Sequence, residues 1–196
     1  YLSGLDLNGP LHLPAQWRYA LTCSLKNLVL TSDAFGDPVT VNNGSFDLTS
    51  ATTPEAARNR VRMNATDLTW GKNHLTLIGT MILSKNETLL DLTLTADAID
   101  WNQVNRILEY VEKKSKDPDS RLSKRGLLGT LKIKADKFNY KTYSVNPLQA
   151  DLAFKPGKVV ITVNQAVVCN ISFQGQLKVN EETLEIFLVP NAVNQL

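Results

Sequence analysis

In the segment Leu90-Asp91-Leu92-Thr93-Leu94-Thr95, apolar and polar residues alternate with a period of two. Successive side chains of a β-strand point to opposite faces, so this alternation predicts a strand that is buried on one face and wet on the other. The same pattern returns along nearly the whole chain, for example in residues 159–163 and 184–188. The sequence therefore predicts a mainly β protein, built as a curved antiparallel meander sheet.

A long sheet with one apolar face can fold over itself, close on itself, or stay open as a trough. The alternation alone does not choose between these forms, so we expect a groove-like or a sandwich-like β-structure with one amphipathic helix. Two glycines, Gly79 and Gly175, fall inside strand patterns, and Asn43-Gly44 is a strong signal for a tight hairpin turn.

The alternation is interrupted once, where apolar residues recur three and four positions apart after Asp100. This spacing and the capping aspartate predict a helix from about Trp101 to Lys114. We expect the helix to plug an open end of its own sheet, and a membrane-binding helix is the alternative. Its expected apolar face consists of Trp101, Val104, Ile107, Leu108 and Val111. The polar, proline-broken segment 113–125 predicts a mobile loop.

Composition places the chain among ordinary globular domains. It has 196 residues, of which 43% are hydrophobic and 20% charged, and its net charge is +2. We interpret residues 1–196 as a single β-rich domain. The near-neutral charge argues against a nucleic-acid partner. No apolar run approaches the roughly 20 residues that cross a bilayer. Since the chain starts at Tyr1, we expect a processed chain or a fragment of a longer protein.

The two cysteines share the parity of the apolar positions around them. Cys23 follows Tyr19 and Leu21 at spacings of two, and Cys169 lies between Val167 and Ile171. Both thiols are therefore expected to point inward. Because both cysteines fall on the expected buried side of strands near opposite ends of the chain, we predict a disulfide between Cys23 and Cys169, which would imply an oxidising compartment. The alternative is a pair of unrelated buried free cysteines.

The sequence contains few residues that could bind a metal ion or catalyse a reaction. Neither His12 nor His74 has a second metal ligand at a suitable spacing, so we predict no metal site. Two carboxylate pairs are interpreted as turn and loop residues: Asp97 with Asp100, and Asp117 with Asp119. No nucleophile or phosphate-binding motif occurs. We therefore predict no catalytic residues and no cofactor.

The second half of the chain resembles the AsmA-like family of Gram-negative bacteria, which includes TamB and YhdP. The first half shares only the strand alternation of that family, and Asn170 stands where the family pattern has a glycine. The resembling segments are Leu92-Thr93-Leu94-Thr95-Ala96-Asp97-Ala98-Ile99-Asp100-Trp101, Gly129-x-Leu131-x-Ile133-x-Ala135, Tyr140, Pro147-Leu148-x-Ala150-x-Leu152, Gly157-x-Val159-x-Ile161-x-Val163 and Ala166-x-x-Cys169-x-Ile171-x-x-x-Gly175-x-Leu177.

The resemblance implies a periplasmic β-groove in a protein tethered to the inner membrane by an N-terminal anchor that this chain lacks. It also implies a role in outer-membrane biogenesis and in phospholipid transport between the membranes, without catalysis. The partners would be phospholipid acyl chains, held by an apolar groove whose candidate residues are Leu75, Leu77, Leu90, Leu92, Leu94, Val159, Ile161 and Val163. The alternative is a closed β-sandwich that serves as a structural or adhesion module.

Overall fold

The computed structural model describes residues 2–9, 12, 18–53, 56–84, 86–115, 126–180 and 183–192. Within them the chain forms a single large sheet and one helix, α1, which runs from Trp101 to Ser115. The strands are β1 Leu2–Asn8, β2 Arg18–Leu30, β3 Val39–Thr53, β4 Ala56–Trp70, β5 Asn73–Leu83, β6 Glu87–Asp100, β7 Gly126–Tyr140, β8 Tyr143–Val145, β9 Leu148–Lys155, β10 Lys158–Val168, β11 Ile171–Asn180 and β12 Leu184–Ala192.

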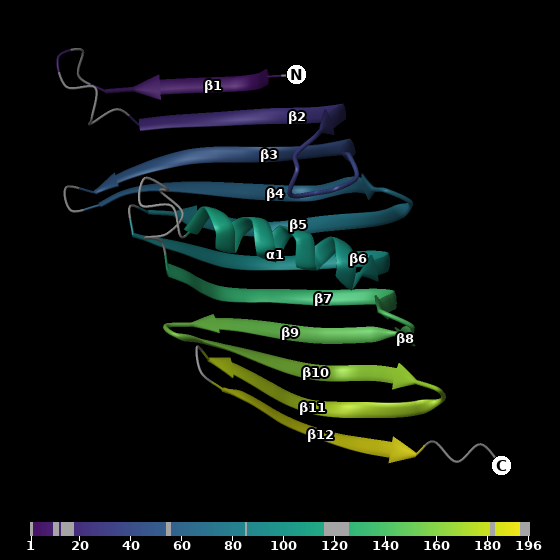
Figure 1. Ribbon diagram of the computed structural model, residues 1–196. Helices are drawn as coiled ribbons and strands as arrows, with labels where there is room; N and C mark the ends of the chain where they lie inside the picture. The colour runs from purple at the N-terminus through teal and green to yellow at the C-terminus, as the bar shows by residue number, and fades with distance from the viewer. Residues whose placement is uncertain are drawn as a thin grey trace.

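The strands follow one another in the sheet almost in chain order, as Figure 1 shows. The order is β1-β2-β3-β4-β5-β6-β7-β9-β10-β11-β12, with the short β8 paired to the end of β7. Neighbours are antiparallel except β6 and β7, which are parallel because α1 carries the chain back across the sheet between them. Ten inter-strand spacings of about 4.8 Å make the sheet roughly 48 Å wide, measured across the strands from β1 to β12.

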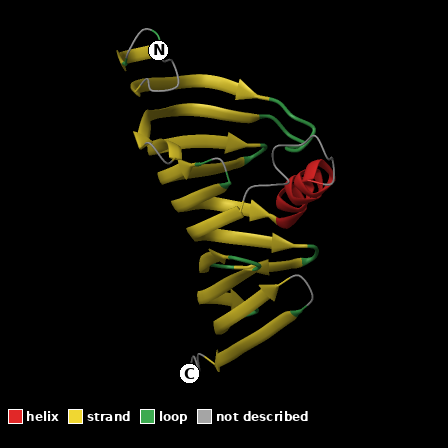
Figure 2. Cartoon of the chain, turned by 90° about the vertical axis from the view of Figure 1, so that its left-hand side faces the viewer, coloured by secondary structure: helices red, strands yellow, loops and turns green. Residues whose placement is uncertain are grey.

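The sheet is a single open, curved layer (Figure 2). The described residues supply no second sheet to pack against it, so the groove-like form is the one observed and the closed sandwich is not. Two glycines beside β6 have backbone angles that L side chains rarely adopt: Gly79 with φ of 140° and Gly129 with φ of 104°. A Cβ on Gly129 would collide with the carbonyl oxygen of Leu90. Glycine therefore permits the close strand contact at these points.

The predicted helix is confirmed, and it covers part of one face of the sheet (Figures 1 and 2). The Oδ1 of Asp100 accepts a 2.8 Å hydrogen bond from the backbone N–H of Asn102, which is the expected N-cap. The rings of Trp101 and Phe138 pack edge to face, with 6.3 Å between their centroids. The segment expected as a loop at 113–125 is helical as far as Ser115, and its remainder lies outside the described residues.

The helix face was predicted correctly only in part. Val104 packs against the small core formed by Ala96, Ile99 and Ala135, but Leu108 is 51% exposed. The side chain of Val111 lies outside the described residues. Leu108 is exposed because α1 contacts the sheet along one side only, and this contact is narrower than the apolar stripe that the helical spacing predicts.

The predicted disulfide is wrong, since Cys23 and Cys169 are both free. Cys23 lies on β2 and Cys169 follows β10, and six strands separate them in the sheet, which corresponds to roughly 34 Å along it. A disulfide bridges Cα atoms up to about 7 Å apart. Cys169 is also exposed, because Cys169 and Asn170, with φ of 49° and 64°, form a two-residue turn rather than part of a strand.

Candidate functional site

The eight candidate groove residues lie on one face of the sheet, which we term the apolar face. Directly paired residues of neighbouring strands share a face, so the register traces this surface across the sheet. Leu92 is paired with Gly79 on one side and with Leu131 on the other. From Leu131 the pairing continues through Leu152, Ile161, Leu177 and Ile186, to the edge strand β12.

The remaining candidates form matching rows beside this central one. Leu94 leads through Ile133 and Ala150 to Val163, and it pairs with Leu77 on β5. Likewise, Leu90 leads through Gly129 and Phe154 to Val159, and Leu75 pairs with Ala96. The register pairs the apolar positions of each strand with the apolar positions of the next strand. The alternation within single strands therefore produces an apolar surface that extends across the sheet.

The helix covers only one margin of the apolar face. Its contacts lie around Ala96 and Ala135, which are 4% and 3% exposed. The surface opens toward the edge strand β12, where Leu184 and Ile186 are both 59% exposed. Among the eight candidates, Leu92 and Val163 are buried by their neighbours in the sheet, and the other six are half-buried.

The loop between β2 and β3 joins the helix at the covered margin. The indole N–H of Trp70 donates a 3.1 Å hydrogen bond to the carbonyl oxygen of Phe35. From α1, the Nε2 of Gln103 donates to Oδ2 of Asp37 over 3.2 Å, and its Oε1 accepts from Nδ2 of Asn73 over 3.4 Å. These contacts fix α1 over one side of the apolar face and leave the rest without a covering layer in the described part of the chain.

The described polar residues that were considered as catalytic or metal-binding candidates form structural hydrogen bonds and do not cluster into a site. Asp97 accepts hydrogen bonds from the backbone N–H groups of His74 and Ala98 through its Oδ1. The ring of His74 is exposed, and its Nδ1 lies 3.4 Å from Oγ1 of Thr69. The described residues hold no group of three or more potential metal ligands. Asp117 and Asp119 lie outside the described residues.

No helix among the described residues has the length and apolar character that a membrane span requires. Comparisons of the chain with known protein families, with curated proteins and with solved structures find no match.

Proposed function

We propose that this chain is a lipid-handling β-groove module whose apolar face holds the acyl chains of phospholipids. The observation that carries the proposal is the continuous apolar surface that α1 covers at one margin only. Exposed apolar patches of this kind are typical of sites that bind a partner, a ligand or a membrane. The observed open sheet favours a ligand over self-packing, because its described residues supply no second layer.

The dimensions suit an acyl chain. The hydrocarbon core of a bilayer is about 30 Å thick, so the acyl chains of one leaflet extend roughly 15 Å. This length corresponds to about three strand spacings. Each methylene that leaves water for an apolar surface contributes about 0.8 kcal/mol. A chain lying along the row from Leu92 to Ile161 would thus gain several kcal/mol from burial alone.

The cellular setting of the proposal rests on the AsmA-like resemblance. In this setting the chain is part of a periplasmic groove, tethered to the inner membrane in the full-length protein. It acts in outer-membrane biogenesis by passing phospholipids between the membranes, without catalysis and without a cofactor. The free cysteines remove the disulfide as an argument for an oxidising compartment, so the location depends on the resemblance.

A pair of substitutions on one strand tests the proposal. Ile161 and Val160 are adjacent, half-buried residues of β10 that face opposite sides of the sheet. We expect Ile161→Asp to abolish binding of a fluorescent long-chain fatty acid, since it places a charge on the apolar face, while Val160→Asp retains it. Circular dichroism establishes that both variants are folded. Equal binding by the two folded variants, or no binding by the unsubstituted chain, would contradict the proposal.

A further inference from the structure

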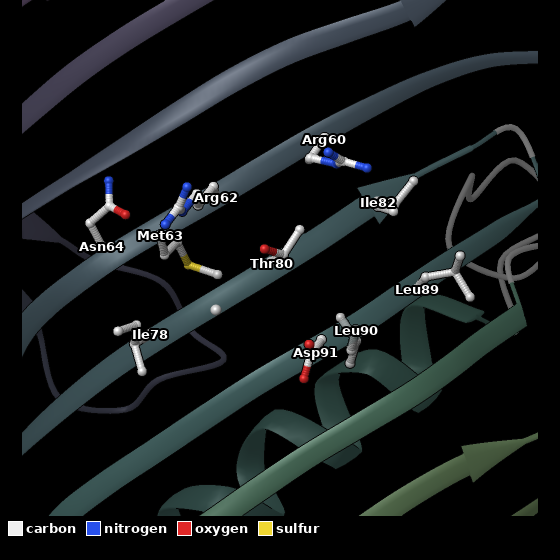
Figure 3. Close-up of a pocket in the computed structure, with 11 residues that line it drawn as sticks. Arg60, Arg62, Met63, Asn64, Ile78, Thr80, Ile82, Leu89, Leu90 and Asp91 are labelled. Carbon is white, nitrogen blue, oxygen red and sulfur yellow. The ribbon is translucent and has the colours of Figure 1, made fainter. Parts of the chain in front are cut away.

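A hollow of about 570 Å³ lies on the face of the sheet opposite to α1. It spans β4, β5 and β6, and Figure 3 shows it with α1 on the far side of the sheet. Arg60 and Arg62 of β4 stand at one side of the hollow, and Asp91 of β6 stands at the other. Between them lies Thr80 of β5, which pairs with both Arg62 and Asp91 in the register.

The two guanidinium groups have no protein partner within the part of the chain that the structure describes. The nearest candidate on β3 is Asp47, which pairs with Arg62 in the register. Its carboxylate is already engaged, because it accepts hydrogen bonds from Oγ1 of Thr22 over 2.9 Å and from Nδ2 of Asn64 over 3.3 Å. Across the hollow, Asp91 accepts a 3.5 Å hydrogen bond from Oγ1 of Thr130.

Arg58 continues the series on the same face of β4, so three exposed arginines stand two residues apart. Their Cα atoms are separated by roughly 6.6 Å per step, and their like charges repel one another. An anion placed between the side chains would relieve this repulsion. Guanidinium groups bind the oxygens of a phosphate or carboxylate with two parallel hydrogen bonds, which matches neighbouring arginines to an oxyanion.

Apolar side chains border the arginines. Ile78 is 47% exposed beside the hollow, and Ile82 and Leu89 line it next to Arg60. This pairing of cationic and apolar groups fits a ligand that carries an oxyanion on an apolar body. We propose that the hollow binds the phosphate group of an amphiphile through Arg60 and Arg62, with Thr80 as a further donor and Ile78 and Ile82 against the apolar part.

This site goes beyond the proposed lipid groove, because it lies on the other face of the sheet. Two sources could supply the same chemistry: the headgroup of a phospholipid in a bilayer, or a soluble phosphorylated compound. Binding to vesicles of phosphatidylcholine with and without phosphatidic acid reports the first source. Titration with inorganic phosphate reports the second, since it offers the oxyanion without the apolar body.

The test compares two double variants of the intact chain. Arg60→Gln with Arg62→Gln removes the proposed ligands, whereas Lys132→Gln with Lys134→Gln removes two exposed charges from β7 on the same face. We expect the arginine variant to bind vesicles containing phosphatidic acid, or inorganic phosphate, at least about tenfold more weakly than the unsubstituted chain, since charge-assisted hydrogen bonds are lost. The lysine variant is expected to stay within about twofold, because its charges lie outside the hollow.

Equal weakening by the two variants would overturn the proposal, because it would indicate attraction by the general surface charge. No binding of either probe by the unsubstituted chain would overturn it as well. Circular dichroism confirms the fold of each variant. Fatty-acid binding to the apolar face is measured in parallel and is expected to be unchanged in the arginine variant, so the two proposals can fail separately.

Discussion

Truncation of one isoleucine under the helix and one on the open part of the apolar face is expected to have clearly different effects on stability. Ile99 is 8% exposed and belongs to the core beside α1, whereas Ile186 on β12 is 59% exposed. Replacement by alanine removes three carbon atoms in each case, worth about 2.4 kcal/mol when fully buried. The two substitutions remove the same atoms, so the difference in the free energy of unfolding reports how deeply each side chain is buried.

The magnitudes follow from the exposed fractions. Ile99 is 100 − 8 = 92% buried, so Ile99→Ala loses about 2.2 kcal/mol of transfer free energy. The cavity that it leaves raises the loss to roughly 2–4 kcal/mol. Ile186 is 100 − 59 = 41% buried, so Ile186→Ala loses about 1 kcal/mol. No cavity term is added there, because the site is open to water.

Urea unfolding at 25 °C, followed by tryptophan fluorescence, measures both changes in the free energy of unfolding. The comparison is valid where the two variants keep the same dependence of this free energy on urea concentration. A loss at Ile186 as large as that at Ile99 would refute the reasoning. It would mean that another layer covers the apolar face at β12.

Three further outcomes are expected. Gly129→Ala should lower the free energy of unfolding by at least about 2 kcal/mol, because its Cβ meets a neighbouring carbonyl oxygen at positive φ, while Gly4→Ala, with open space around it, should change it by less than about 0.5 kcal/mol in the same urea titration. Asp100→Ala should lower the free energy of unfolding by about 1 kcal/mol, because the N-cap hydrogen bond of α1 is lost. An unchanged urea midpoint would contradict that role. Thiol titration without reductant should find both Cys23 and Cys169 reactive after unfolding and the exposed Cys169 reactive in the folded chain; fewer than two thiols would indicate a disulfide.

Much of the fold could be predicted from the sequence because alternation and helical spacing are local properties. The strand around Leu92 and the helix after Asp100 are read directly from the residues, and both are confirmed. The direction of neighbouring strands is not local. The parallel pairing of β6 with β7 depends on where α1 returns the chain, and its signal was the length of the helical connection between two strand patterns.

Two predictions made from short sequence patterns are wrong, because the pairing of neighbouring strands determines the structure at these positions. Asn43-Gly44 was predicted as a hairpin turn, but it lies inside β3, where the pairing with β4 shifts. There the missing Cβ of Gly44 leaves room for the side chain of Thr66. Cys169 has the sequence parity of Val167 and Ile171, yet it lies in a two-residue turn. Across this turn Val168 pairs with Ile171 and Val167 with Ser172, so equal parity no longer means the same face of the sheet.

The sequence predicts which residues of each strand are on its apolar side, but it does not predict how these residues align across the sheet. Alternation assigns Leu92 and Ile161 to the apolar sides of their own strands. Their alignment in one row depends on the pairing through Leu131 and Leu152, which no single strand encodes. The hollow beside Arg60 and Arg62 was missed for the same reason, although two arginines at a spacing of two on one strand were a visible signal.

The most direct test of the central proposal is photo-crosslinking along β10 in the presence of phospholipid. A benzophenone amino acid is placed in turn at Val159, Val160, Ile161 and Thr162, whose side chains alternate between the two faces. If the apolar face holds acyl chains, lipid adducts form at positions 159 and 161 and not at 160 and 162. Adducts without this alternation, or none at any of the four positions, would contradict the proposal.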